Sequence, residues 1–417
     1  MKIGKKPGIF ILLAVLILLT TAAYARRAVN GAVPVAVPYM QENAPAQQLP
    51  AQNVSMIFVE NSDGTGDGAA RLIRSMRNHG IDLHQGPASP AGLIAPNDVV
   101  ILKINAQWAE RGGTNTDLIR GVIQEILNHP SGFTGEIIVA DNGQAQFGSA
   151  PGGGGSLDWG NRNNAVNRNQ STMTVIRYFQ GQGHRVTGVL WDTFTRTRVQ
   201  AFSAGDMRDG FVVENTVRPT GITISYPKFT TEFGTHVSFR EGIWDPATRT
   251  YNSGILKVIN MPVLKSHRGF QVTAAVKNYM GVPSDWLTHQ ARSGMQGRAH
   301  NSVGTGGMGT LMVETRMPVL NIMDMIWIST QDGPRSDFAT AVQVNQIAAS
   351  TDPVAIDYWA ARHVLMPRAP AAVRARKDPS GTQPGTFGHW LRLSMNELHR
   401  AGIWATMNPA EMRVVGP

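Results

Sequence analysis

The first third of the chain alternates apolar runs with amphipathic segments, and this alternation restricts its fold more than any other feature. Three apolar runs have the length of buried strands: 54–60 (VSMIFVE), 98–105 (DVVILKIN) and 136–142 (EIIVADN). The segments between them, 69–80 and 117–129, carry apolar residues at helical spacing, and Thr116 is the expected N-cap of the second. Strands that alternate with helices are typical of a parallel sheet, so the sequence predicts an α/β fold.

The same alternation continues through the rest of the chain. Residues 172–184 and 185–193 have the patterns of a helix and a strand. Later elements are expected as a strand at 255–264, a helix at 270–281 with Gly281 as its C′ residue, a strand at 318–328, and a helix that starts near Ser350 and Thr351 with Pro353 in its first turn. No internal repeat is evident.

Short alternating runs from residue 221 to residue 252 indicate a β-hairpin insertion in the middle third. The expected hairpin joins THVSFREGIW to TRTYNSG through the turn DPAT (245–248). We therefore expect residues 54–417 to form a single α/β domain, with a mainly parallel sheet flanked by helices and an inserted loop and hairpin region at about 150–252.

The N-terminal segment has the pattern of an export signal. Lys2, Lys5 and Lys6 precede an apolar stretch, and Ala23-Tyr24-Ala25 has the small residues of a cleavage site. Residues 1–25 are thus expected to be a signal peptide, or else an uncleaved signal anchor, because the apolar stretch is only slightly shorter than a membrane span. Residues 26–53 are expected to be a flexible lead-in to an exported domain, periplasmic or secreted.

Cysteine is absent from the chain, and charge is scattered along it. Without cysteine we expect no disulfide, no iron-sulfur cluster, no c-type haem and no thiol nucleophile. Removing the three N-terminal lysines lowers the formal net charge from +9 to +6, and no basic run is longer than two residues. This pattern does not favour a nucleic-acid partner, although it suits a small anionic ligand or the cell envelope.

Lysine is rare here, and half of the lysines beyond the N-terminal segment lie in apolar sequence. The chain has 29 arginines and nine lysines, and Lys103, Lys265 and Lys277 each end or interrupt an apolar run. An ammonium group is costly to remove from water, so a chain that otherwise uses arginine should place lysine there for a reason. Lys277 could also be a lysine whose stem packs while its head reaches water.

Polar residues also end several of the predicted strands. In open α/β sheets the ligand crevice lies outside the carboxyl ends of the strands, so these residues mark a candidate site. They are Lys103, Asn105, Asp141, Asn142, Lys265, Ser266 and His267, with Asp324 inside a later apolar run and Asp352 and Asp357 at the last predicted helix. Each could instead be a helix cap, a turn residue or part of a structural ion pair.

Several motifs in this order resemble the domain-of-unknown-function family 362. They are LKINAQW, GGTNTDLIRGVI, IIVADN, NMPVLKSHRGFQVTAAVKNYMG, VLNIMD and ASTDPVAIDYWAA. The resemblance extends from about residue 54 to the C terminus, and its most specific parts are the lysine-histidine segment and the DPVAID segment. Some relatives carry ferredoxin-like cysteine motifs, and this chain lacks them. Redox chemistry of those relatives is therefore not carried over to this chain.

Other motifs give weaker indications. GTGGMG (304–309) matches a dinucleotide-binding pattern, but no strand precedes it, so a mobile loop is expected. The turn NSDGTGDG after the first strand is a weak anion-site candidate. None of the eleven histidines forms an HxxxH or HxH pair, so no metal site is predicted from local sequence.

Two classes of function fit these residues. In the first, an exported enzyme acts on a small carboxylate or phosphate. Its expected catalytic residues are His267, Lys265 and Asp141, and its expected ligand-binding residues are Lys103, Asn105, Lys277, Asn278, Asp324 and Asp352. In the second, the same groups bind an anion or a metal ion at the cell envelope without chemistry. We expect Lys103, Lys265 and His267 to converge at the carboxyl edge of the sheet, and Asp352 with Ser350 or Thr351 to cap the helix of Asp357. The sequence gives no prediction of the reaction, the cofactor or the oligomeric state.

Overall fold

The computed structural model of the protein describes residues 54–143, 154–288, 298–333 and 336–416. The signal segment and the lead-in expected at 1–53 lie outside these ranges, as does part of the glycine-rich stretch near residue 150. Among the helices in the described ranges, none has both the length and the apolar character needed to cross a membrane.

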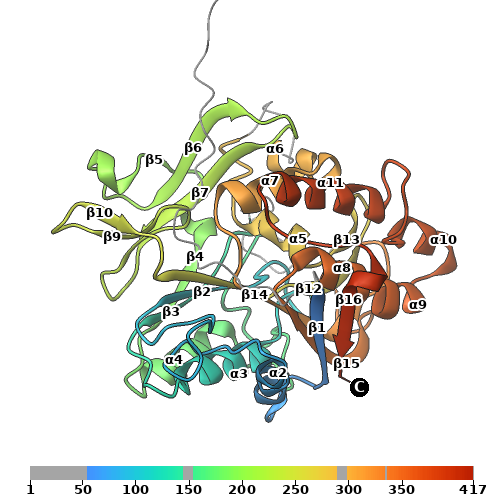
Figure 1. The fold of residues 1–417 in the computed structure, drawn as a ribbon, viewed down its shortest axis with the longest axis horizontal. Coiled ribbons are helices and arrows are strands. Elements are labelled where there is room, and N and C mark those ends of the chain that lie inside the picture. The colour runs from blue at the N-terminus through green and yellow to red at the C-terminus, as the bar shows by residue number, and fades with distance from the viewer. Residues whose placement is uncertain (1–53, 144–153, 289–297, 334–335, 417) are drawn as a thin grey trace, which may run out of the picture. The chain divides into compact units, whose positions relative to one another are not determined.

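A mixed, mainly parallel sheet organises the described residues (Figure 1). Its ten strands are β1 (Ser55–Asn61), β2 (Val99–Lys103), β3 (Glu136–Asp141), β4 (Val186–Leu190), β11 (Leu256–Asn260), β12 (Val263–His267), β13 (Gln271–Thr273), β14 (Leu320–Ser329), β15 (Val342–Ser350) and β16 (Met412–Val415). The order is β16-β1-β15-β14-β11-β2-β3-β4, and β12 pairs with β14 and with β13. Within the described pairings only β15 and β13 run antiparallel to their neighbours, which confirms the predicted α/β class.

The first strand lies apart from the second. β1 pairs with β15 and β16, and β15, β14 and β11 separate it from β2. The sequence pattern identifies strands and helices but says nothing of strands inserted from distant parts of the chain. Since β1 still runs in the same direction as β2 and β3, its end reaches the same edge of the sheet.

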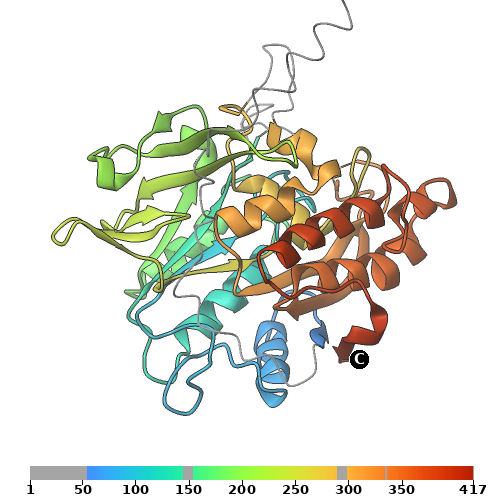
Figure 2. The same ribbon diagram turned by 45° about the horizontal axis from the view of Figure 1, so that its top comes forward.

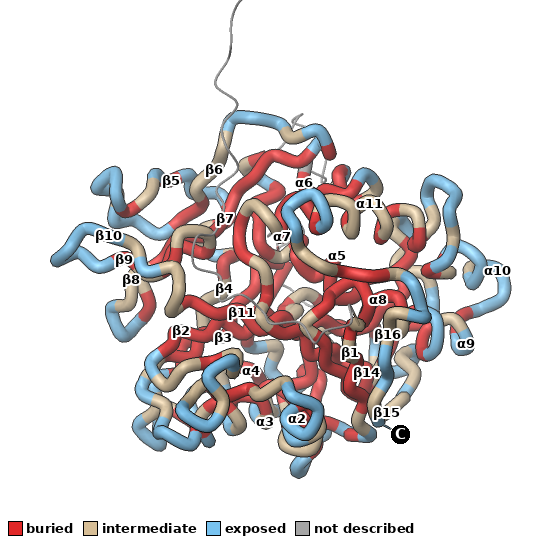
Figure 3. Tube along the Cα trace, viewed as in Figure 1, coloured by how far each residue is buried: buried red, intermediate tan, exposed pale blue. Residues whose placement is uncertain are grey.

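Helices cover both faces of this sheet (Figure 1). On one face α2 (Gly68–Asn78), α3 (Thr116–Leu127) and α4 (Thr172–Gln180) pack on Val100, Leu102, Ile137, Val139 and Ile259. On the other, α5 (Ala275–Asn278), α7 (Gly307–Glu314), α8 (Pro353–Ala360) and α11 (Phe387–Arg400) pack on Ile101, Ile138, Ala140 and Val258. Successive strand residues thus face opposite cores, as the pleat requires, and the tube of Figure 3 is buried along the central strands.

The remaining described helical segments are short. They are the α-helical turns α6 (Arg298–Asn301), α9 (Met366–Arg368) and α10 (Ala371–Arg374), a π-helical turn at Ala361–Leu365, and 3-10 turns at Trp191–Phe194, Phe202–Ala204, Tyr279–Gly281, Ser302–Thr305, Ala375–Lys377 and Pro409–Glu411.

A second sheet occupies the middle third, where the sequence predicted a hairpin. Its strands are β5 (Arg198–Val199), β6 (Gly210–Val217), β7 (Thr223–Thr230), β8 (His236–Ser238), β9 (Gly242–Asp245) and β10 (Thr250–Asn252). The DPAT turn joins β9 to β10 as predicted, but the run 235–244 is two strands and not one. It breaks before Gly242, whose φ of +105° suits glycine and not a continuous strand. The hairpin is therefore one edge of a six-stranded sheet in the described residues.

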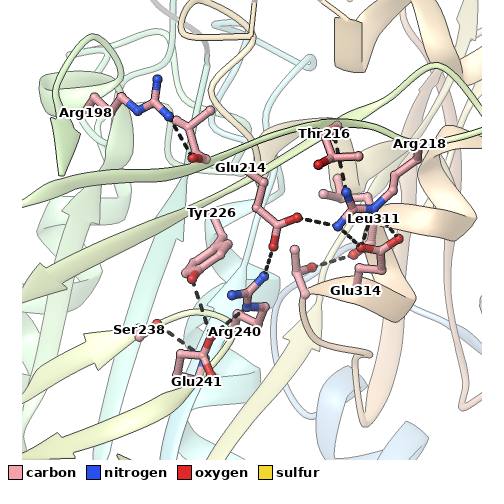
Figure 4. A network of polar contacts seen from close by, with 12 residues as sticks. Arg198, Glu214, Thr216, Arg218, Tyr226, Ser238, Arg240, Glu241, Leu311 and Glu314 are labelled. Atoms are coloured by element: carbon pink, nitrogen blue, oxygen red, sulfur yellow. Dashed lines mark hydrogen bonds and ion pairs between the residues drawn. The ribbon is translucent and has the colours of Figure 1, made fainter. Parts of the chain in front are cut away.

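A chain of charges joins this second sheet to helix α7 (Figure 4). Arg218 forms ion pairs with Glu214 and with Glu314 of α7, and Arg240 pairs with Glu214 and Glu241. Arg240 also lies over the ring of Tyr226, 4.5 Å from its centroid. Because Glu214 lies between the two arginines and Arg218 also pairs with Glu314, the ion pairs link the second sheet to α7.

Several local predictions were wrong in detail. Asn115, and not Thr116, caps α3, because its side chain accepts the backbone N–H groups of Asp117 and Leu118. The run 255–264 is two strands, β11 and β12, separated at Met261 and Pro262. The expected helix at 270–281 is strand β13, then α5, then a 3-10 turn.

The GTGGMG motif is also different from its prediction. Gly307 begins helix α7, which packs beside α11 (Figure 2), so the motif is not a mobile loop. A Cβ atom at Gly309 would overlap the backbone oxygen of Ser394 in α11. The glycines therefore allow two helices to approach closely, and the match to a dinucleotide pattern is a coincidence of packing.

Candidate functional site

A row of polar residues crosses the sheet at its carboxyl edge. Lys103, Asn260, Asn321 and Ser350 lie opposite one another on β2, β11, β14 and β15. Asn260 donates to Asn321 Oδ1 at 2.9 Å, and Asn321 donates to the Ser350 carbonyl at 3.1 Å. Strand alternation directs these side chains to the face that carries α5, so the row forms a polar floor beneath that helix.

Lys103 and Asp141 form a buried ion pair at one end of this floor. Lys103 Nζ lies 2.6 Å from Asp141 Oδ1 and donates to the Ile104 carbonyl at 2.9 Å. The second carboxylate oxygen of Asp141 accepts the Ala106 N–H. Burial lowers the pKa of Lys103, and the charge of Asp141 opposes that change. A Cβ atom at Gly281 would overlap both charged groups, so glycine is required there for close approach and not as a helix C′ residue.

Lys265 on β12 has hydrogen-bond acceptors but no ion-pair partner among the described residues. Its Nζ donates to Asn105 Oδ1 at 3.1 Å and to the Gly112 carbonyl at 2.7 Å. Burial, followed by the positive charge of Lys277, lowers the pKa of Lys265 to about 7. The group therefore changes its protonation state near neutral pH.

Lys277 is the least satisfied cation of the cluster. It is 7% exposed, and within the described residues its Nζ makes no hydrogen bond and no ion pair. Its described neighbour is the ring of Phe270, whose centroid lies 5.5 Å away. Burial lowers its pKa to about 8, while the charge of Asp285 acts in the opposite direction.

His267 ends β12 as a neutral imidazole. Its Nδ1 accepts the backbone N–H groups of Gly269 and Phe270, each at 3.1 Å. The proton of the neutral ring is therefore assigned to Nε2. Burial, and then the charge of Lys277, holds the pKa of His267 far below its usual value. The ring can donate a hydrogen bond but is a poor proton acceptor.

Two amides link these groups. Asn105 Nδ2 donates to Asn278 Oδ1 at 3.2 Å, and Asn278 Nδ2 donates to Asn260 Oδ1 at 2.8 Å. The structure thus brings six of the predicted site residues together in one cluster, with His267 close enough for the lysine charges to act on it. The six are Lys103, Asn105, Asp141, Lys265, Lys277 and Asn278. Their catalytic or ligand-binding roles stay predictions.

Asp324 and Asp352 lie outside this cluster. Asp324 accepts the backbone N–H groups of Asn115 and Ile326, and burial raises its pKa to about 6. Lys265 is near enough to act on it electrostatically, although no ion pair joins the two. Asp324 therefore stabilises the loop that leads into α3.

Asp352 is the N-cap of α8, as predicted. It accepts the backbone N–H groups of Val354 and Ala355, and its second oxygen accepts the Ser55 hydroxyl at 2.5 Å. Ser350 assists by accepting the Asp352 N–H. Within the described residues, Asp352 forms hydrogen bonds with the start of α8, with Ser55, with Ser350 and with Thr406. It forms no hydrogen bond or ion pair with a lysine there. Its position supports a structural role and not the predicted ligand contact.

The sequence singled out Asp357 but gave it no contact with this cluster, and it did not single out Asn260, Asp285 or His300. Asp357 on α8 accepts the backbone N–H groups of Ala275 and Val276 at 2.6 and 3.0 Å, and so caps α5 from a distant helix. His300 lies with its Nδ1 3.7 Å from Asp285. Asn260 ends a strand and could have been found by that rule, whereas nothing local marks Asp285 and His300.

Every lysine in the described ranges is buried. Burial is therefore not limited to the three lysines that the sequence singled out. Lys103, Lys228, Lys257, Lys265, Lys277 and Lys377 are each at most 9% exposed. Their contacts differ, because Lys228 lies over the Phe202 ring and Lys377 pairs with Asp332 at 2.7 Å. In the same ranges no three His, Cys, Asp or Glu residues gather as a metal site would require.

Comparison with known proteins places part of this cluster in a family. The model of the family described as Domain of unknown function (DUF362) matches residues 254–362. This segment includes both of the most specific motifs of the predicted resemblance, and the wider resemblance from residue 54 to the C terminus stays a prediction. Neither a curated protein nor a solved structure matches the chain. Residues 254–362, which carry Lys265, His267 and Lys277, are thus the part of the chain that matches the DUF362 family model.

Proposed function

We propose that this protein is an enzyme that binds a small anionic substrate, a carboxylate or a phosphate, at Lys265, Lys277 and His267. The observation that carries the proposal is the buried Lys277 side chain, whose ammonium has no hydrogen-bond acceptor or ion-pair partner among the described residues. A buried charge without a partner is costly, and an anion would supply the missing counter-charge.

The neighbouring groups suit the same anion. Two acceptors hold Lys265, so one of its three N–H donors is left for a ligand. His267, with its proton on Nε2, offers a neutral donor. Lys103 contributes less, because Asp141 already neutralises it. The site thus combines two cations and one neutral donor.

Catalysis is supported by the protonation of Lys265. Its pKa of about 7 lets it take up or release a proton near neutral pH, which a general acid or base must do. His267 is a donor in this proposal and not the base, because burial and the lysine charges oppose its protonation. Asp141 orients Lys103 and takes no direct part.

A non-catalytic anion-binding protein is the second candidate, and a specific observation favours it. His267 cannot accept a proton readily, so one of the three groups expected to perform chemistry has lost that capacity. The two candidates share the binding site and differ only in what happens to the bound anion.

Calorimetric titration with pyruvate and with inorganic phosphate at neutral pH tests the site. Binding is expected in the wild type and in the matched variant Lys228→Met, which removes a buried lysine of the second sheet. Lys277→Met should abolish it. Equal affinity in Lys277→Met and the wild type would overturn the proposal.

The fate of the anion separates the two candidates. Each anion that binds is followed by proton NMR over time with the wild type and with Lys277→Met. Chemical change that requires Lys277 supports an enzyme, whereas a bound and unchanged anion supports the binding protein.

We further propose that the protein is exported through its N-terminal segment. The basic residues, the apolar stretch and Ala23-Tyr24-Ala25 support this. Mass spectrometry of the chain from its native host should show a mature protein that begins at Arg26, or an intact chain in the membrane fraction if the segment is an anchor. An intact chain found only in the cytosol would contradict export.

A further inference from the structure

Lys277 differs from the other five described lysines in its surroundings. Each of those five donates a hydrogen bond to an oxygen: Lys103 to Ile104, Lys228 to Asp206, Lys257 to Gly254, Lys265 to Asn105 and Gly112, and Lys377 to Gln271 and Asp332. Lys277 has no such acceptor in the described ranges and faces an aromatic ring instead. Among the described residues, the ammonium form of five lysines thus has an acceptor, and that of the sixth has none.

The amine of Lys277 gives up its proton more readily than that of an ordinary lysine. Burial lowers its pKa to about 8, the charge of Lys103 acts in the same direction, and the charge of Asp285 opposes the change. The neutral form carries a free electron pair, and it is the nucleophilic form of lysine. Lysines that form imines with carbonyl substrates are activated in the same two ways, by a hydrophobic pocket and by a neighbouring cation.

We propose that Lys277 forms an imine with the carbonyl carbon of a 2-oxo acid whose carboxylate is held by Lys265. The proposal rests on the anion site described above and names its substrate class. Lys265 suits the holding role because two acceptors fix its head, whereas no hydrogen bond restrains Lys277 among the described residues.

The step balances without any further reactant. The neutral Lys277 nitrogen attacks the carbonyl carbon, and the carbonyl oxygen gains a proton to give a carbinolamine. The C–O bond then breaks, and the oxygen leaves as water with the two hydrogens that the nitrogen has lost. His267 can donate its Nε2–H to that oxygen as negative charge develops there.

Reductive trapping with pyruvate tests this step directly. The full chain is incubated with pyruvate and cyanoborohydride, which reduces an imine to a stable secondary amine, and the labelled peptide is identified by mass spectrometry. Label is expected on Lys277 before any other lysine. Lys2, Lys5 and Lys6 report background reaction, and unfolded chain, in which all nine lysines are accessible, is the reference.

Variants and a second ligand complete the test. Lys277→Arg keeps the charge but cannot form an imine, so it should not be labelled at that position, and Lys228→Arg should label as the wild type does. Folding of each variant is checked by circular dichroism, and the wild-type peptide map decides the matter even if one variant does not fold. Label spread over the N-terminal lysines without preference for Lys277 would overturn the proposal.

Lactate tests the anion site independently of the imine. It carries the same carboxylate as pyruvate but no carbonyl group. Lactate binding without a pyruvate adduct on Lys277 would reject the imine and keep the anion site. An adduct on Lys277 without lactate binding would keep the imine and reject the proposed anion site, and the absence of both would reject both.

Discussion

At the scale of single residues, the lysines of the cluster differ in whether a carboxylate forms an ion pair with them. Lys103 lies 2.6 Å from Asp141, whereas Lys277 has no such partner among the described residues. The pKa values of Lys265 and Lys277 fall to about 7 and about 8, below the usual value of 10.5. In the unfolded chain both regain ordinary values, so unfolding takes up protons between these limits.

Stability should therefore rise with pH from about 7 to about 10.5 through these two lysines. Lys277→Met removes one of them while keeping most of the stem. A shift of two to three pKa units corresponds to about 3 kcal/mol, so the variant should be more stable than the wild type at neutral pH by up to about that amount. Urea unfolding at several pH values checks this, and the difference should shrink toward pH 10.5. A variant less stable than the wild type at neutral pH would show that the ammonium is stabilised in a way this account omits.

Gly281 provides a second test at the residue scale. A Cβ atom there would overlap Asp141 and Lys103, so Gly281→Ala must displace a buried ion pair. We expect a loss of about 3–5 kcal/mol, as when a buried pair is broken. Gly304→Ala is the matched control, because a Cβ atom at that position meets nothing within 4 Å. Equal stability of the two variants would mean that the 3-10 turn moves aside freely.

At the scale of elements, helix α5 is short and depends on a distant cap. Its four residues, Ala275–Asn278, could not hold a helix by themselves. Asp357 of α8 accepts the first two N–H groups, and this contact orients Lys277. Burial raises the pKa of Asp357 to about 8, while the two backbone donors act in the opposite direction.

Asp357→Ala should weaken anion binding although it touches no ligand. It leaves two buried N–H groups without acceptors, each of which costs about 1–3 kcal/mol. We expect lower stability together with lower affinity for pyruvate, measured by unfolding and by calorimetry. Asp245→Ala, in the exposed turn between β9 and β10, is the control that should leave affinity unchanged. Unchanged affinity in Asp357→Ala would mean that α5 does not need its cap to present Lys277.

Element by element, the sequence predicts best where burial and local pattern agree. Strand runs such as 136–142 are apolar between polar ends, and these ends correctly marked Lys103 and Asp141. The sequence predicts one helix at 270–281, because its apolar residues suit a helix as well as a strand. The first part of this segment is a strand because β13 pairs with β12, and local sequence does not show that contact. The cap by Asp357 was missed for the same reason.

At the scale of the whole described domain, two sheets share one core. Side chains from β6, β7 and β8 pack with those of the main sheet and of α5, α7, α8 and α11. Arg316 also connects them, because it donates to the carbonyl groups of Phe239, Arg240, Ser253 and Leu256. The order of strands could not be predicted from sequence, since it depends on contacts between segments far apart in the chain.

The shared core predicts a single cooperative unfolding transition. Tryptophan fluorescence and far-ultraviolet circular dichroism should give coincident curves in urea. Arg316→Met leaves four carbonyl groups without their donor and should lower the midpoint of both curves together. Separate transitions in the variant would show that the second sheet is an independently folding unit.

The central claim is that Lys265 and Lys277 form a buried pair of cations that an anion binds, because neither has an ion-pair partner among the described residues. With nine lysines, the chain labelled with ¹³C at lysine Cε gives few NMR signals. Those of Lys265 and Lys277, assigned by their loss in Lys265→Met and Lys277→Met, should titrate near 7 and near 8, and both should move to higher pH when lactate or phosphate is added. Titration of both signals at the ordinary value of 10.5, with no response to either anion, would contradict the account.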